Sequence, residues 1–494
     1  MATVSRSRAA PDTPGRGART ALRLVLPAAA AMLGVAAVLW VVYEPSHVNY
    51  DARYALLWAR DLWDGARPDY TAAFAPTPHP LSTAVSSLAL PFGHDGDRLI
   101  TAIVLLSFGL LGWLVLRLGA QLFSPLVGAV AALTVVTRPV LQRDALLAYQ
   151  DVPFAALVVG AVLLEARRSR RGAPVLALLT LAGLLRPEAW VLAGLYLLYL
   201  WPEASPRARA GLTALVAFAP VLWAVTDWLV TGDLLHSLHG TAALAEEAGR
   251  RRHIDQVPYW TAQYFGYTLR EPLVLGVPLG LAFAWLYRRR RSALPIAVVV
   301  AMTAVFAIGP LFGLPLIGRY VRTPAVLLTL FYGLAVAGWL LLAPGAARRR
   351  WMAVGVAAAG LSVVFLPRHL EMLQGLERRI AADGELYADL RRVADSPAVR
   401  EALAACGALT TSDHRPVPHL RWWLDGGPHA VRTIAGGANP MSGVFLTPRE
   451  VPLTTRFYRR NFPAATAPSS YRRLYVNASW RVDAAPRCVR RPRA

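Results

Sequence analysis

An aspartate just beyond the first long apolar stretch of the chain is the first residue whose position suggests chemistry. Asp51 lies in the polar segment 46–54, a few residues after that stretch. A carboxylate at the edge of a membrane can act as a general base that removes a proton from a hydroxyl group. The residues that follow predict a helix lying in the membrane interface, with an apolar face formed by Tyr54, Leu57, Trp58 and Leu62. The alternative is structural: Asp51 caps this short helix.

A second acidic segment lies between the third and fourth apolar stretches. It contains Arg143 and Asp144, and it ends at Asp151, two residues before Pro153. The structural alternative makes Asp151 the N-cap of the next helix, with the proline in its first turn. Two acidic segments that face one side of a membrane suit glycosyl transfer. One carboxylate then deprotonates an acceptor hydroxyl, and others orient the acceptor or a cation.

Arginines in three other places are candidates for holding a phosphate group, because a guanidinium pairs with phosphate oxygens through two hydrogen bonds. Arg319 comes first, followed by Arg186 and the run Arg250–Arg252. Each has a structural alternative. Arg319 and its neighbour Tyr320 can anchor a helix at the membrane interface. The segment 186–188 can be a helix break with a local ion pair, and the run can be a solvated helix face.

The composition identifies the class of protein. Of the 494 residues, 55% are hydrophobic, and the mean hydropathy is +0.39. The net charge of +22 does not indicate nucleic-acid binding, because the arginines lie in short clusters between apolar blocks. About twenty apolar residues cross a bilayer. A polytopic, mainly α-helical membrane protein with about eleven spans is therefore predicted, at 21–43, 99–118, 122–141, 152–166, 173–185, 188–201, 210–230, 272–287, 293–312, 321–343 and 351–367.

The arginine clusters also predict the orientation of these spans. If the N-terminus is inside, every predicted cytoplasmic loop carries arginine, as the positive-inside rule requires. Both acidic segments then face the outside, and the first span is a retained signal anchor. The external loop that contains Arg250–Arg252 departs from the rule. The predicted parts are a cytoplasmic tail (1–20), a transmembrane catalytic domain (21–367) and an extracytoplasmic domain (368–494).

The last part of the chain has a different pattern. Charged helical patterns at 370–380 and 386–393 precede short apolar runs such as 408–411 and 444–446, separated by Gly and Pro. This predicts a small α/β domain. It holds both cysteines of the chain, Cys406 and Cys488. Outside the cytoplasm they can form a disulfide, and the alternative is two free thiols.

The acidic segments belong to an ordered series of short motifs within residues 40–330. The series comprises Asp51, Thr77-Pro78-His79-Pro80-Leu81, Phe92-Gly93, Asp97-Arg98-Leu99, Arg143-Asp144-Ala145, Asp151-Val152-Pro153-Phe154, Leu185-Arg186-Pro187-Glu188 and Gly318-Arg319-Tyr320 before Pro324. The order resembles that of the GT-C membrane glycosyltransferases, which include the protein mannosyltransferases and the lipid A aminoarabinose transferases. Many relatives have a second carboxylate beside the first-loop aspartate. Because this chain lacks it, a divalent cation remains an open alternative and no cofactor is assigned.

The resemblance implies a polyprenyl-phosphate-linked sugar as donor, used at the outer face of the plasma membrane. We expect Asp51 to be the general base, and Asp151 and Asp144 to position the acceptor or stabilise positive charge on the sugar. The acceptor is a glycan, a lipid or a protein. The rival functions are a transporter or lipid flippase, and a non-enzymatic envelope protein. The candidate substrate-binding residues are Arg319, Tyr320, Arg186, Arg143, His79, Arg250 and Arg251.

Overall fold

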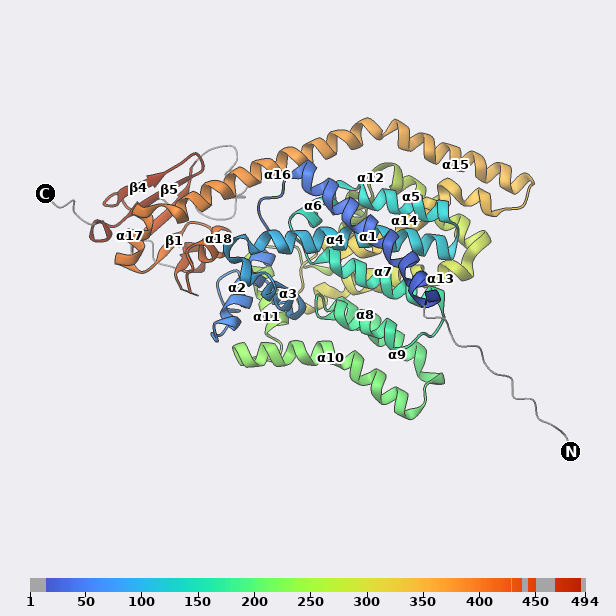
Figure 1. Ribbon diagram of the computed structural model, residues 1–494, viewed down its shortest axis with the longest axis horizontal. Coiled ribbons are helices and arrows are strands. Elements are labelled where there is room, and N and C mark those ends of the chain that lie inside the picture. The colour runs from blue at the N-terminus through green and yellow to red at the C-terminus, as the bar shows by residue number, and fades with distance from the viewer. Residues whose placement is uncertain (1–14, 428, 438–442, 450–466, 490–494) are drawn as a thin grey trace.

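Long apolar helices run through the centre of the molecule, and a small sheet lies at one end (Figure 1). The computed structural model describes residues 15–427, 429–437, 443–449 and 467–489; the side chains of 15–25, and with them the first arginine cluster, lie outside the described part. The central helices, with half or more of their residues buried, are α4 (Gly96–Leu122), α7 (Asp151–Arg167) and α14 (Arg322–Ala337). Packed against them are α1 (Gly15–Tyr43), α5 (Pro125–Val136) and α12 (Val257–Phe283). Small residues bring neighbours close: a Cβ on Gly119 of α4 would lie 2.5 Å from Cα of Gly128 in α5.

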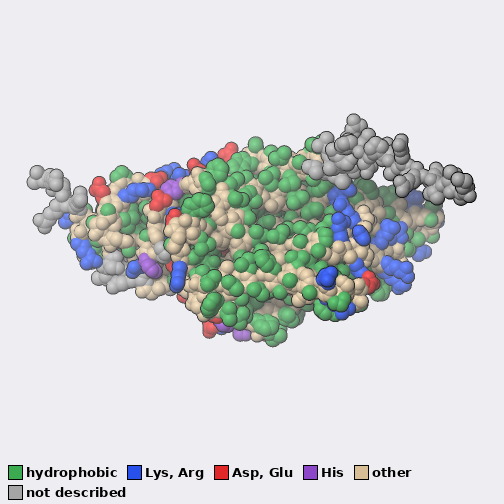
Figure 2. Space-filling view, turned by 60° about the horizontal axis from the view of Figure 1, so that its bottom comes forward, with side chains coloured by type: hydrophobic (Ala, Val, Ile, Leu, Met, Phe, Trp, Pro, Cys, Tyr) green, Lys and Arg blue, Asp and Glu red, His purple; other side chains and the backbone are tan. Residues whose placement is uncertain are grey.

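A second group of helices packs on α7 through its own apolar core. It consists of α8 (Ala173–Gly183), α9 (Glu188–Leu200), α10 (Pro206–Thr231) and α13 (Arg289–Ile308). Figure 2 shows hydrophobic side chains covering the middle of one face and charged side chains toward both ends, with basic ones most frequent toward one of them. Such a band is what a lipid environment requires of a membrane protein.

Five helical stretches of the described chain are long and apolar enough to cross a membrane, or up to seven if each bent pair of helices is one span. The helices at three expected spans are too short to be counted among these stretches: α7 has 17 residues, α8 has 11 and α9 has 13. The expected span 122–141 is broken, because α5 and α6 (Pro139–Leu146) meet at an angle of 60°. The multi-pass architecture is confirmed, and the number of spans stays a prediction.

Short helices gather at the end of the bundle that faces the sheet (Figure 1). They are α2 (Tyr50–Trp63), α3 (Pro80–Ser87), α6, α11 (His236–Glu247) and α18 (Pro416–Trp423). The prediction that α2 lies in the membrane interface is wrong. Tyr54, Leu57 and Trp58 are buried in the protein core, and Leu62 is 53% exposed. The apolar face of α2 therefore packs on protein, including α18.

The C-terminal part is connected by a long helical arm. α15 (Ala346–Val364) and α16 (Leu366–Asp395) meet at 45°. The two helical patterns expected at 370–380 and 386–393 form one continuous helix, because nothing between them breaks it. A single cluster of buried apolar residues extends from the bundle into this part. The sheet-bearing region therefore packs directly on the bundle.

The predicted small α/β domain is confirmed. Its five strands have the order β2-β1-β3-β5-β4, with β1 (Leu409–Thr411), β2 (Val431–Thr433), β3 (Val444–Pro448), β4 (Arg472–Val476) and β5 (Trp480–Ala484). β1 is parallel to β2 and β3, and β5 is antiparallel to β3 and β4. Cys406, the last residue of α17 (Pro397–Cys406), is joined to Cys488 by a disulfide. Closing a loop with a sequence separation of 82 contributes roughly 4.5 kcal/mol in the chain-entropy model.

Candidate active site

Asp51 lies in the first turn of α2 and is not its cap. The N-cap is Asn49, whose side-chain oxygen accepts a hydrogen bond of 3.1 Å from the backbone N–H of Ala52. The Asn49 amide also donates to the carbonyl oxygen of Leu147 at 2.7 Å. The start of α2 is thus tied to the end of α6. Because Asn49 satisfies the helix start, the carboxylate of Asp51 is available for another contact.

That contact is an ion pair with Arg319. A guanidinium nitrogen of Arg319 lies 2.6 Å from Oδ2 of Asp51. The side chains of Asp51 and Arg319 are 21% and 27% exposed, so a substrate can reach the pair. Burial alone would raise the pKa of Asp51, but the Arg319 guanidinium outweighs it and holds this pKa below its usual value. The structure therefore brings together the expected base and the expected phosphate ligand.

Asp144 forms a second, more buried pair. Its carboxylate lies 3.0 Å from Nε of Arg322 and 3.6 Å from Arg143. The side chains of Asp144 and Arg322 are only 6% and 9% exposed. The sequence analysis missed Arg322, although its spacing gives a signal. It lies one helical turn after Arg319 at the start of α14, where the helix dipole disfavours a cation unless a carboxylate compensates it.

Asp151 forms a third pair, with Arg186. Arg186 also contacts Glu188 at 2.6 Å, so the local ion pair that was the alternative for 186–188 is present. Asp151 and Arg186 are 4% and 5% exposed. The ring of Tyr320 covers Arg186 at 4.6 Å, which gives this tyrosine a protein contact in the site. The N-cap alternative for Asp151 is wrong, because α7 has Gln150 as its N-cap.

The three arginines of the run Arg250–Arg252 lie in different environments. Arg250 contributes to lowering the pKa of Asp51, so its charge acts on the site. Arg251 stacks on the ring of Trp260 at 3.8 Å, and Arg252 pairs with Glu246 at 3.1 Å. Among the described residues, no ion pair or hydrogen bond engages the side chain of Arg250. Only this member of the run adds free positive charge beside Asp51.

His79 lies within the same group of charges. Its side chain is partly buried, and burial lowers its pKa to about 3, with Arg319 and Arg186 acting in the same direction and Asp51 opposing them. Its Nδ1 has no hydrogen-bond partner among the described residues. A neutral imidazole beside a carboxylate and two guanidinium groups can donate or accept one hydrogen bond to a substrate.

The C-terminal domain holds α2 in place, which the sequence did not indicate. Arg60, near the end of α2, donates hydrogen bonds to the carbonyl oxygens of Arg421 (3.3 Å) and Gly426 (3.0 Å). Arg53 is fully buried, pairs with Asp97 at 2.6 Å and lies 5.5 Å from the ring of Trp423. The helix that carries Asp51 is therefore fixed from both the bundle and the C-terminal domain.

A pH profile tests the electrostatics of this site. Because the pKa of Asp51 is lowered in the folded protein, its pair with Arg319 stabilises the fold above about pH 4 and weakens as the pH falls through the lowered pKa. His79, with a pKa of about 3, is neutral over the same range. We expect kcat/KM to show no acid limb from either group between about pH 5 and 7. An inflection near pH 6 that disappears in His79→Gln would contradict this.

No group of three or more His, Cys, Asp or Glu side chains among the described residues is arranged to hold a metal ion. The three candidate catalytic aspartates instead contact arginine. The electrostatic pattern is thus one of carboxylate–guanidinium pairs at one end of the helical bundle.

Comparison with known proteins identifies the fold. No protein-family model matches the chain, and no curated protein matches it in sequence. The crystal structure of ArnT from Cupriavidus metallidurans bound to undecaprenyl phosphate superposes with a TM-score of 0.57 at 14% identity, covering 94% of this chain and 98% of that chain. The chain has the ArnT fold. This agrees with the membrane-helical fold that the order of motifs implied. The same ArnT in the apo state has 15% identity and a TM-score of 0.48, with the same coverage.

Proposed function

We propose that this protein is a membrane glycosyltransferase that moves a sugar from a polyprenyl-phosphate donor to an acceptor hydroxyl. The observation that carries the proposal is the contact of 2.6 Å between Asp51 and Arg319 within an ArnT-type fold. It joins a carboxylate that can accept a proton to a cation that can hold a phosphate. The polyprenyl donor is further supported by the undecaprenyl phosphate in the ArnT structure.

The chemistry assigns a different part to each member of the pair. The acceptor oxygen bonds to the anomeric carbon of the sugar, and its proton passes to the Asp51 carboxylate. The bond between that carbon and the phosphate oxygen breaks, and both electrons leave with the polyprenyl phosphate. Arg319 compensates the negative charge that develops on this leaving group, with Arg250 as a second cation.

The ion pair also makes donor binding precede the activation of Asp51 as a base. In the donor-free protein, Arg319 keeps Asp51 ionised but makes it a weaker base. A donor phosphate competes for the same guanidinium and draws it away from Asp51. The basicity of the carboxylate then rises when the sugar is in place. A water molecule or acceptor that arrives earlier meets a less reactive base.

Asp144 and Asp151 position other side chains in the proposed mechanism. Their side chains are 6% and 4% exposed and contact Arg322 and Arg186. At this depth they orient guanidinium groups, and they act on the acceptor or the sugar through those groups. The charge of Arg319 acts on His79 and Tyr320, which places both near the pair, and Arg143 contacts Asp144. A divalent cation bound together with the donor could reach the partly exposed carboxylate of Asp51.

The orientation belongs to the proposal as well. The helix α2, whose first turn holds Asp51, lies on the side of the C-terminal domain, and α15, which begins with an arginine cluster, starts at the opposite end (Figure 1). Under the positive-inside rule, the site and residues 368–494 are extracytoplasmic. We expect a reporter that is active only in the cytoplasm to be silent when fused after Ala494 and active when fused before residue 15. A strong signal from the C-terminal fusion would reverse the orientation.

Removing the Arg319 guanidinium tests the donor assignment. We expect Arg319→Ala to weaken retention of polyprenyl phosphate by about 10- to 100-fold, the size of a lost charge-assisted hydrogen bond. The measurement is binding of a labelled polyprenyl phosphate to purified protein. Arg252→Ala is the matched control, because Arg252 pairs with Glu246 and not with Asp51. Unchanged retention in Arg319→Ala would remove Arg319 from the donor site.

A further inference from the structure

A large apolar cavity lies at the other end of the molecule. Its volume is about 730 Å³, and it lies open on one side between α4, α7, α8, α9 and α13. Cavities of this size hold molecules as large as a drug or a lipid chain. The wall is mostly aliphatic and includes Val158, Leu179 and Leu294. None of the candidate catalytic or substrate-binding residues lines it.

The position of this cavity follows from the directions of its helices. α7 begins at Asp151, but the cavity reaches Glu165, almost at the end of that helix. α13 begins at Arg289, and its other end packs through Phe306 on Val321, next to the site. The cavity includes Arg290 and Arg291 at the start of α13. At 1.5 Å per residue, these arginines lie roughly 24 Å from Phe306 along the helix.

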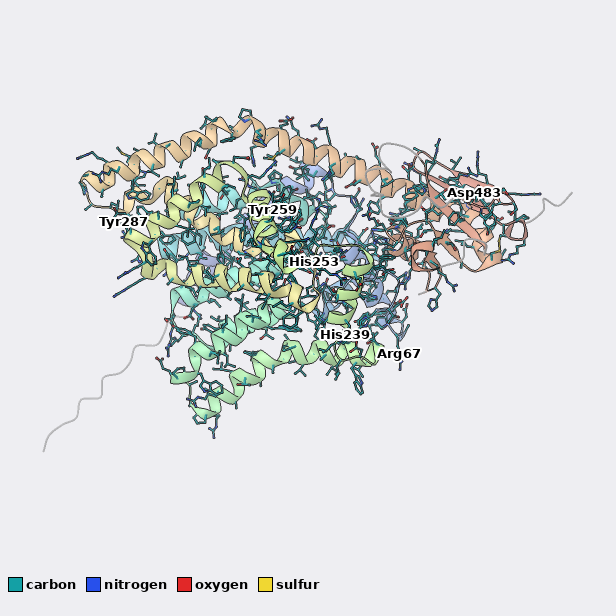
Figure 3. All side chains as sticks on the ribbon, turned by 180° about the vertical axis from the view of Figure 1, so that it is seen from behind. Arg67, His239, His253, Tyr259, Tyr287 and Asp483 are labelled. Carbon is teal, nitrogen blue, oxygen red and sulfur yellow. A yellow bond between two sulfur atoms is a disulfide. The ribbon has the colours of Figure 1, made fainter. Side chains whose placement is uncertain are left out.

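Figure 3 shows the two ends clearly. Tyr287, which precedes α13, lies at the end opposite Asp483 of the C-terminal sheet, and His253 lies between them. The mouth of the cavity is thus remote from the Asp51–Arg319 pair. A phosphate group bound at Arg290 cannot at the same time contact Arg319.

Two arginines at the mouth lack acidic partners among the described residues. Arg290 is exposed and makes no ion pair or hydrogen bond there, and Arg291 donates only to the carbonyl oxygen of Leu122, at 3.3 Å. Glu165 is the acidic residue of the wall. Its oxygens already accept from Tyr196 (2.5 Å) and from the backbone N–H groups of Arg170 (2.7 Å) and Arg171 (3.3 Å). Neither arginine is therefore paired with a carboxylate among the described residues, and both lie beside an apolar interior.

We propose that this cavity binds one anionic phospholipid of the surrounding membrane. An acyl chain fills the apolar interior, and the phosphate contacts Arg290 and Arg291. Charge complementarity favours an anionic head group over a zwitterionic one, because the positive amine of the latter would face the same arginines. The distance from Arg319 separates this lipid from a reacting donor. The inference is independent of the proposed glycosyl transfer.

Native mass spectrometry of protein taken from mixed membranes tests the site. The probe is phosphatidylglycerol, offered together with an equal amount of phosphatidylcholine. We expect the unaltered protein to retain one phosphatidylglycerol. In the variant Arg290→Ala/Arg291→Ala, retention should fall by about tenfold or more, since two charge-assisted contacts are lost. Arg290→Ala alone leaves the hydrogen bond from Arg291 to Leu122 in place. It should lower the retention of phosphatidylglycerol in the same direction, but by less.

A matched control uses arginines at the same end of the molecule. Arg349 and Arg350 of α15 are exposed and do not line the cavity, so Arg349→Ala/Arg350→Ala should retain the lipid. Ala297 lines the cavity and is exposed, so Ala297→Phe should fill space and reduce retention without touching a charge. If Arg290→Ala/Arg291→Ala and Arg349→Ala/Arg350→Ala lost phosphatidylglycerol equally, the lipid would be held by general attraction to positive charge. That result would overturn the site. Displacement of phosphatidylglycerol by an equal amount of polyprenyl phosphate would also overturn it, since the cavity would then belong to the donor.

Discussion

Asp51→Asn is expected to slow glycosyl transfer by about 10²- to 10⁴-fold, the range for loss of a general base. The amide keeps the shape of the side chain and one acceptor oxygen, but it cannot take up the acceptor proton. Retention of polyprenyl phosphate should not fall and should rise slightly, because Arg319 loses the carboxylate that competes with the donor phosphate. The measurement is single-turnover transfer from a polyprenyl-phosphate sugar, with donor binding measured separately.

The control for this substitution lies at the other end of the same helix. Asp64 is the C-cap of α2 and is exposed, so Asp64→Asn should transfer sugar at close to the unaltered rate. Asp51→Asn should also remain folded, since the pair that it breaks is open to solvent and Asn49 still caps α2. Near-normal turnover in Asp51→Asn would place the base elsewhere, with Asp151 the next candidate. Unchanged function in both Asp51→Asn and Arg319→Ala would favour transport or a structural role over transfer.

Arg322→Met is expected to destabilise the protein by roughly 3–5 kcal/mol, because it leaves the buried carboxylate of Asp144 without its closest cation. The side chains of this pair are 6% and 9% exposed, so water cannot take over the lost contact. Arg143 remains 3.6 Å from Asp144, which places the effect at the lower end of that range. Thermal unfolding in detergent, followed by intrinsic fluorescence, measures the change.

Two further variants separate the loss of charge balance from the loss of packing. Arg143 is 35% exposed, so Arg143→Met should cost less than about 1 kcal/mol. The double variant Asp144→Leu/Arg322→Met removes both buried charges and should recover most of the stability, as buried pairs replaced by apolar residues often do. A double variant no more stable than Arg322→Met would show that the cost lies in packing.

The position of α2 links stability to catalysis. Arg60 and Arg53 hold this helix against the C-terminal domain, and Asp51 sits in its first turn. A displacement of about 1 Å at a reacting group can cost about 100-fold in rate. The C-terminal domain therefore belongs to the catalytic unit in the proposed function, although its residues make no ion pair with Asp51 among the described contacts.

The sequence by itself determined the membrane-helical class, the small α/β domain and the segments that make up the site. These properties depend on local patterns: apolar length sets the spans, alternation and turn residues set the strands, and arginine clusters mark one end of the bundle. The candidate site residues from Asp51 to Arg319 were chosen from the order of motifs alone, and their roles stay predictions.

Only the tertiary structure decided which charges are partners and which residues remain exposed. Asp51 and Arg319 are 268 residues apart in the chain and Asp144 and Arg322 are 178 apart, so no local pattern pairs them. The environment of α2 was also decided by the tertiary structure. Its apolar face was assigned to the membrane but packs on protein. Hydrophobic burial depends on the apolar area removed from water, and the sequence does not show whether lipid or protein covers that area. The disulfide between Cys406 and Cys488 likewise depended on the fold bringing two distant thiols together. Long-range contacts of this kind are fixed by the packing of whole helices, which a linear pattern does not contain.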